Sequence, residues 1–337
     1  MSSLLSAAPT PSVRQPALEV RFGSAAANDW GRALSFVTVE LGAAPAVDAV
    51  EVAIAPGQHA PAVAIGDTGG VSLGFAGALV PVFSGLVASV ARSVNGPTRI
   101  VATNAAGVLA RLRVNQSYEQ LSAGRIVSEL ANGAGITNTA ADGVSFPYYT
   151  VDDSRSAWAQ VAALARVCGF FATVDAQGGL VFGPAQTTPV KTFTYGVDIL
   201  ALQAAESAPS FGKVTVVGEG AAGSQGSDAW SWLLKDPAAI AATAGSGTPE
   251  RLVQDSSLRS KSAAQSAADA ASARAQSLAG AGRLVVPGTP EIVPGGSVEI
   301  KGAPDAALNG VRTAHVVRHR FAKSAGFVTT IDFGRTP

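Results

Sequence analysis

The segment Gly218-Glu-Gly220-Ala-Ala-Gly223 has the glycine spacing of a dinucleotide-binding loop. In such a site the glycines end a strand and open a helix whose N-terminus holds the pyrophosphate. Strand-like residues 214–217 precede the glycines, but residues 224–228 continue as a loop, and residues 239–247 lack the acid expected about 20 residues on. A flexible loop is therefore the default interpretation. A nucleotide-binding protein or enzyme that uses Gly218 to Gly223 is the alternative.

The residues best suited to bind a transition metal are three histidines and one cysteine: His59, His315, His319 and Cys168. His315 and His319 are four residues apart, a spacing that puts two side chains on one face of a helix or of a strand. A third ligand is not evident, and nearby cationic side chains would repel a metal ion: Arg312, Arg318 and Arg320. The pattern favours structural or surface histidines, and we expect neither a metal site nor a bound cofactor.

Carboxylates and nucleophiles do not form a catalytic motif in this sequence. Asp152 and Asp153, with Ser154, stand before a predicted helix and are explained as its capping residues. Glu119 and Glu129 lie on or beside another short helix whose opposite face is apolar. The sequence has neither a nucleophile elbow nor a catalytic cysteine with its own histidine. It therefore predicts a protein that is not an enzyme, unless the fold assembles acids from distant positions.

The bulk composition limits the partners of the chain. Lysine plus arginine and aspartate plus glutamate both number 24 among 337 residues, so no net charge attracts nucleic acid or an anionic membrane. Charged residues make up only 14% of the chain against a norm of about 25%, and apolar residues make up 47%. This indicates a surface largely covered by other subunits, or equally a genome rich in alanine and glycine codons. The single cysteine fits synthesis in a reducing compartment.

Export and membrane insertion are both disfavoured. The N-terminus reaches its first basic residue only at Arg14, so the positive region of a secretion signal is missing. Residues 68–91 carry no charge and are numerous enough to cross a bilayer. Glycines and Pro81 interrupt them, however, and Val71, Leu73 and Phe75 alternate as on a strand. We expect strands here, no membrane anchor, and synthesis in the bacterial cytoplasm.

Apolar patterning divides the chain into three regions. Closely spaced apolar runs from residue 18 to residue 112 predict strands of a barrel or sandwich, without a helical period. Next, Ser122 caps a predicted short helix, a second helix runs from residue 153 to Cys168, and residues 170–182 predict a hairpin that turns at its glycines. Residues 113–190 thus predict a small α+β module between a domain of residues 1–112 and a domain of residues 191–337.

The last region is again mainly β, with a helix inside it. Alanines at helix spacing predict this helix over residues 254–280, and their small side chains would let it lie close against a sheet. Strand-like runs precede the helix and follow it. The predicted fold class is α+β, mainly β, with two β-barrel domains, an intervening small α+β module and the alanine-rich helix.

Two stretches resemble the phage late control protein D family of tail baseplate hubs, which is related to the hub part of type VI valine-glycine-repeat spike proteins. The first runs from Tyr149 through Trp158 to Phe182 and has the family's helix followed by a Gly-aromatic strand and a hairpin. The second contains the Pro294-Gly295 and Asn309-Gly310 turns and the strand with His319. Weaker similarity, in the same order, covers nearly the whole chain.

This resemblance implies a structural baseplate hub of a phage tail or contractile injection system. Both barrel domains would be tail-tube-like, and three chains would form a ring that adapts the sixfold tail tube to the threefold spike. The expected partners are further copies of the chain, the tail tube or tube-initiator protein, other baseplate proteins and a separate spike protein, because the sequence stops at Pro337 without a stalk. We expect no nucleic-acid specificity, and assembly into the baseplate of the particle. An exported adhesin built of β-modules is a further alternative.

Overall fold

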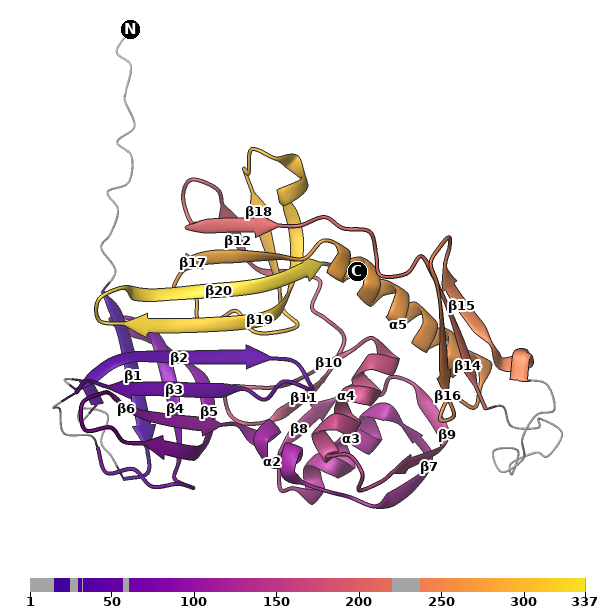
Figure 1. The fold of residues 1–337 in the computed structure, drawn as a ribbon, viewed down its shortest axis with the longest axis horizontal. Coiled ribbons are helices and arrows are strands. Elements are labelled where there is room, and N and C mark those ends of the chain that lie inside the picture. The colour runs from indigo at the N-terminus through magenta and orange to yellow at the C-terminus, as the bar shows by residue number, and fades with distance from the viewer. Residues whose placement is uncertain (1–14, 25–29, 32, 57–60, 220–236, 337) are drawn as a thin grey trace, which may run out of the picture.

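A 12-stranded sheet dominates the computed structural model, which describes residues 15–24, 30–31, 33–56, 61–219 and 237–336. The sheet lies beside a smaller region of helices and short strands (Figure 1). The predicted fold class, α+β and mainly β, is confirmed. Among the described strands no ladder joins β1 to β2 or β12 to β13, so hydrogen bonding does not close either half of the sheet into a barrel.

The large sheet consists of two halves from opposite ends of the chain. The first half holds β1 (Pro16–Phe22), β2 (Leu34–Gly42), β3 (Ala49–Ile54), β4 (Thr68–Phe75), β5 (Ala78–Ala91) and β6 (Thr98–Thr103). The second half holds β12 (Pro189–Thr194), β13 (Ala201–Ala204), β17 (Gly282–Pro287), β18 (Ser297–Lys301), β19 (Gly310–Ala322) and β20 (Gly326–Arg335). In Figure 1 the indigo strands of the first half lie below the yellow strands of the second.

Both halves have the same strand order. If the strands of each half are numbered one to six along the chain, both run two, three, six, five, four, one: β2-β3-β6-β5-β4-β1 and β13-β17-β20-β19-β18-β12. Neighbouring strands within a half are antiparallel, except that β12 and β18 are parallel. The chain therefore contains two copies of one six-stranded unit, which differ in the direction of their first strand. A single apolar core extends through both.

A second apolar core belongs to the middle of the chain. Its elements are α2 (Ala105–Arg111), β7 (Gln116–Ser122), α3 (Ala123–Gly133), β8 (Asn138–Ala140), β9 (Ser145–Val151), α4 (Ala157–Cys168), β10 (Phe171–Val174) and β11 (Leu180–Gly183). The predicted Ser122 cap is confirmed, because its hydroxyl accepts the Arg125 N–H at 3.3 Å. The predicted hairpin is β10–β11, and the Asp175 carboxylate accepts the Gly179 N–H across its turn at 2.8 Å.

A long insertion separates the second and third strands of the second half. It contains β14 (Lys213–Gly218), η2 (Pro237–Ile240), β15 (Ala242–Gly245), β16 (Glu250–Asp255) and α5 (Lys261–Ala279), whereas η3 (Ala306–Leu308) lies later in the chain. The strands form a sheet of their own, in the order β15-β14-β16. Val214 and Ala264 from this insertion are fully buried in the second core. Residues 191–337 therefore contribute to both cores.

Three local predictions were wrong. Residues 18–112 do contain a helix, α2, whose seven residues are too few to show a clear period; Asn104 caps it by accepting the Ala106 N–H. Helix α4 begins at Ala157 rather than at residue 153, and its cap is Ser156 rather than Asp152, Asp153 or Ser154, because the Asp152 carboxylate accepts the N–H of Ser154 in a turn. The alanine-rich helix begins at Lys261 rather than at 254, because the residues up to Asp255 pair with β14 as strand β16.

The charge-free residues 68–91 form strands β4 and β5, as the alternation of Val71, Leu73 and Phe75 predicted. In the part of the chain that the structure describes, none of the helices combines the length and the apolarity needed to span a bilayer.

Candidate functional site

The two copies of the six-stranded unit are joined by one antiparallel ladder, which we call the seam. It pairs β2 with β19, from Phe36 opposite Ala322 to Gly42 opposite Val316. The other edge of β19 pairs with β20, and its first residues also pair with β18. β19 is thus long enough to pair with β18 and β20 of its own unit and also with β2 of the first unit. The seam makes a continuous hydrogen-bonded surface from two repeats.

Side chains on the two faces of the seam differ in character. On the outer face the Arg318 guanidinium donates to the Glu40 carboxylate from Nε at 3.0 Å and from Nη2 at 2.7 Å. Both side chains are well exposed, so this pair contributes about 0–1 kcal/mol. On the inner face Val37, Val39 and Val317 are completely buried. Burial of these valines is the larger stabilising effect, because each is worth about 1.5–3 kcal/mol.

His319 lies on the inner face of the seam. It stands opposite Val39 of β2 and Thr329 of β20, and its Nδ1 is 3.0 Å from the Thr329 hydroxyl. That hydroxyl also accepts the N–H of Thr289 at 2.9 Å. Burial lowers the pKa of His319 to about 4. The imidazole is therefore neutral at pH 7 and acts as a structural residue of the core.

We expect the seam to weaken in acid through His319. Because its pKa falls from 6.5 to about 4 on folding, the unfolded chain binds more protons between these values. Neutral His319 makes its full contribution to the free energy of unfolding above pH 6.5. This contribution falls by about 3 kcal/mol as the pH drops toward 4. Urea unfolding of the chain and of His319→Gln across this range measures it. A variant with the same acid dependence as the unsubstituted chain would contradict the assignment.

The second histidine of the predicted pair lies elsewhere. The β19–β20 ladder has an extra residue between Ala314 and Val316, so His315 occupies a β-bulge and the simple alternation fails there. Its ring lies 5.6 Å from that of Phe171 in β10, and its Nε2 lies 3.4 Å from the Ser277 hydroxyl of α5. His315 thus contacts the middle module, whereas His319 faces the sheet core.

The described residues contain no group of three or more His, Cys, Asp or Glu side chains that could hold a metal ion. His59 lies outside them. Cys168 accepts the Val144 N–H at 3.4 Å, and burial raises the pKa of its thiol, which disfavours the reactive thiolate.

Gly218, the first glycine of the dinucleotide-like segment, has a packing role. It ends β14, where an added Cβ would lie 1.8 Å from the Leu258 carbonyl oxygen. Only glycine allows the two backbones to approach this closely. Gly220, Gly223 and the rest of the predicted loop up to Asp228 lie outside the described residues. Close packing accounts for Gly218 without a nucleotide.

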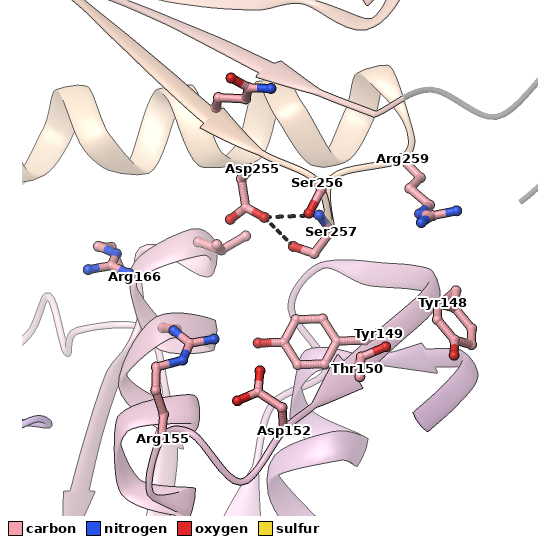
Figure 2. Close-up of a pocket in the computed structure, with 13 residues that line it drawn as sticks. Tyr148, Tyr149, Thr150, Asp152, Arg155, Arg166, Asp255, Ser256, Ser257 and Arg259 are labelled. Atoms are coloured by element: carbon pink, nitrogen blue, oxygen red, sulfur yellow. Dashed lines mark hydrogen bonds between the residues drawn. The ribbon is translucent and has the colours of Figure 1, made fainter. Parts of the chain in front are cut away.

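A cavity of about 420 Å³ lies between the middle module and the inserted segment. Figure 2 shows Tyr149 and Asp152 on the module side and Asp255 on the side of the insertion. The Asp255 carboxylate accepts the N–H and the hydroxyl of Ser257 at 3.0 and 2.7 Å. Arg155 and Arg166 supply positive charge from the α4 side.

The lining of this cavity is poorly suited to acid–base chemistry near neutral pH. Burial raises the pKa of Tyr149 to about 12, so its hydroxyl stays protonated. Hydrogen bonds from Ser154 lower the pKa of Asp152, so it stays ionised. The lining includes neither histidine nor cysteine. The cavity is better explained as a polar gap where the middle module and the insertion meet.

The chain is similar to solved structures of phage tail proteins and of a type VI secretion component. The 43 kDa tail protein of prophage MuSo2 from Shewanella oneidensis matches with 14% identity and a TM-score of 0.73, over 95% of this chain and 98% of its own. A tail protein from Neisseria meningitidis MC58 matches with 15% identity and a TM-score of 0.73, over 95% and 97%. A component of the E. coli type VI secretion system, itself described as similar to T4 bacteriophage tail proteins gp27 and gp5, matches with 11% identity and a TM-score of 0.57, over 95% and 77%.

At these identities the likeness concerns the fold, and the chain therefore has the mainly β fold of phage tail proteins. A family model described as the Alg8 N-terminal domain matches residues 63–323, and the chain belongs to that family. Comparison with the curated proteins gave no match.

Proposed function

We propose that this chain is a structural baseplate hub of a phage tail or contractile injection system, of the late control protein D kind. The observation that carries the proposal is the duplicated six-stranded unit, joined through the β2–β19 seam. One chain then presents two equivalent units to a tube, so three chains present six. A ring of three chains can in this way have nearly sixfold symmetry on one side and threefold symmetry on the other. The fold shared with phage tail proteins supports this role.

In this proposal each predicted domain has a mechanical task. The tube-like units are supplied by residues 1–112 and by the sheet strands of residues 191–337, and the module of residues 113–190 braces them. The bracing contacts are specific, because Trp158 of α4 bonds to the β2–β3 connection and His315 of β19 contacts Phe171 of β10. A hydrogen-bonded ladder resists shear, so the seam would transmit force between the units. This mechanical role requires no catalysed reaction. The protein would not be an enzyme.

The expected partners are two further copies of the chain, the tail tube or tube-initiator protein, a separate spike protein and other baseplate proteins. Light scattering of the full chain, alone and mixed with candidate tube and spike proteins from the same source, tests the proposal. We expect a trimer, and a complex that contains all three proteins. Class averages from electron microscopy should show a ring with six lobes. A monomer that binds neither the tube protein nor the spike protein would contradict the proposal.

A further inference from the structure

We infer that neighbouring chains of this ring join through a second copy of the seam, in which β13 of one chain pairs with the end of β5 in the next. This inference rests on the proposed function, since it names the contact by which the ring closes. It starts from the duplication. The seam joins the second strand of the first unit, β2, to the fifth strand of the second unit, β19. Two strands hold the same positions in the other unit but take no part in the seam. They are β13, the second strand of the second unit, and β5, the fifth strand of the first unit.

Matching β-bulges align the two fifth strands. In β19 the extra residue is His315, between Ala314 and Val316, and the residues that follow it pair with β2. In β5 the extra residue is Ala88, which lies between Val87 and Ser89 in the ladder with β6. Both bulges occur against the sixth strand of the unit. The segment that begins at Ser89 therefore corresponds to the part of β19 that forms the seam.

Ladder registers extend this correspondence to the second strands. In the first unit a row of directly opposed apolar residues crosses strands five, six, three and two: Val90, Ile100, Val52 and Val37. The second unit has a matching row: Val317, Ile331, Leu284 and Leu202. All eight side chains contribute to the sheet core. Val37 of β2 therefore corresponds to Leu202 of β13, and Val90 corresponds to Val317.

This correspondence converts the seam into a predicted register between chains. The seam pairs Glu40 with Arg318. Counted along the strands from the matched rows, Glu40 corresponds to Ala205, just after β13, and Arg318 corresponds to Ala91 in β5. We therefore expect Ala205 of one chain to lie opposite Ala91 of the next. The same register places Ser207 opposite Ser89, and it brings Val94 toward Leu202 as Phe321 stands opposite Val37 in the seam.

Both predicted partners have an open edge in the described chain. Among the described strands β13 pairs with β17 alone. In the residues that follow β13, the N–H groups of Ala205 and Ser207 donate to the carbonyl oxygens of Ala281 and Ala279, on the side of β17. The alternate residues therefore direct their backbone groups to the open edge. On the β4 side of β5 the hydrogen bonds end at Val87, and Ser89 and Ala91 are exposed.

Exposed edges of this kind usually carry devices that prevent pairing, such as charges, prolines or covering loops. Between Ala201 and Ser207 the only charge is Glu206, which is already paired with Arg335, and residues 203–210 are all exposed. Beside the β5 edge the side chain of Val94 is 97% exposed. A second copy of the chain is the fitting occupant, because each chain carries both halves of the ladder and a head-to-tail contact can close a ring.

Disulfide trapping tests the register. Ala205→Cys and Ala91→Cys would be introduced together into a chain that carries Cys168→Ser. Directly opposed residues of an antiparallel pair have Cα atoms about 4.5–5.5 Å apart, within the range of about 4.4–6.8 Å that a disulfide spans. Under oxidising conditions we expect most of the protein to run as covalently linked dimers and trimers on a denaturing gel, and to return to single chains on reduction. The matched control replaces Ala205→Cys by Ala201→Cys, about 13 Å further along the strand, and should cross-link at least tenfold less.

Different outcomes separate this inference from the proposed function. A trimer that forms normally, but in which the Ala205–Ala91 cysteine pair links no better than the control, would overturn the strand pairing and leave the hub function intact. A trimer in which Ala205→Cys reacts with a thiol reagent until the tube protein is added would assign this edge to the tube protein and would also overturn the inference. A chain that stays monomeric with and without tube and spike proteins would contradict both.

Discussion

The Trp158→Ala variant should lose about 3–5 kcal/mol of its free energy of unfolding. Trp158 is 2% exposed and fills the second core from α4. Its indole N–H also donates to the Ala46 carbonyl at 2.8 Å. Ala46 lies between β2 and β3, so this one side chain joins the middle module to the first unit of the sheet. The substitution leaves a large cavity and removes one of the contacts that join the two cores.

Urea unfolding, followed by circular dichroism, measures this effect, and Trp158→Phe is the matched control. Phenylalanine retains most of the buried ring but cannot donate to Ala46, so it should cost about 1–3 kcal/mol. We also expect the alanine variant to unfold less cooperatively, because the module and the sheet share fewer contacts. An alanine variant within about 1 kcal/mol of the unsubstituted chain would be inconsistent with a bracing role for α4.

A second large effect is expected from the pH dependence of Asp48. This residue is 3% exposed, and its carboxylate accepts the Gly42 N–H and an Asn104 amide N–H, each at 2.7 Å. Burial outweighs these hydrogen bonds and raises the pKa of Asp48 from 3.8 to about 7. The folded chain therefore binds more protons between these values than the unfolded chain does. The Asp48 contribution is complete below pH 3.8 and is lost as the pH rises through 7, by on the order of 4 kcal/mol.

His319 acts in the opposite direction over an overlapping range, so the two effects partly cancel in the unsubstituted chain. The measurement therefore compares His319→Gln with the double variant that also carries Asp48→Asn. In His319→Gln alone the free energy of unfolding should fall from pH 4 to pH 7, and in the double variant this slope should disappear. If both variants keep the same slope, Asp48 is not its origin.

Local structure was largely predictable from the sequence. The β10–β11 hairpin and the Ser122 cap depend on residues within a few positions of one another, and the alternation of Val71, Leu73 and Phe75 gave β4. Local signals failed where two residues competed for one task. Asp152, Asp153 and Ser156 can all cap a helix, and the choice of Ser156 follows from the turn that Asp152 forms with Ser154.

The candidate site was less accessible to such reasoning. His315 and His319 have a spacing that suggests one shared site, yet a single bulged residue directs one toward the module and the other into the sheet core. The bulge has no distinct signal in the residues around Ala314. The Gly218 segment matched a dinucleotide motif, and only its contact with the Leu258 carbonyl gave the physical reason for the glycine.

By itself the sequence determined that strands bracket a small helical module, because turn residues and the period of apolar side chains act over short distances. Only the tertiary structure decided that β2 pairs with β19, that both units share one strand order, and that the insertion with α5 packs with the middle module. These choices join residues as distant as Phe36 and Ala322. Many strands offer a similar apolar face, and the partner is selected by how all of those faces are buried together, which no local pattern encodes.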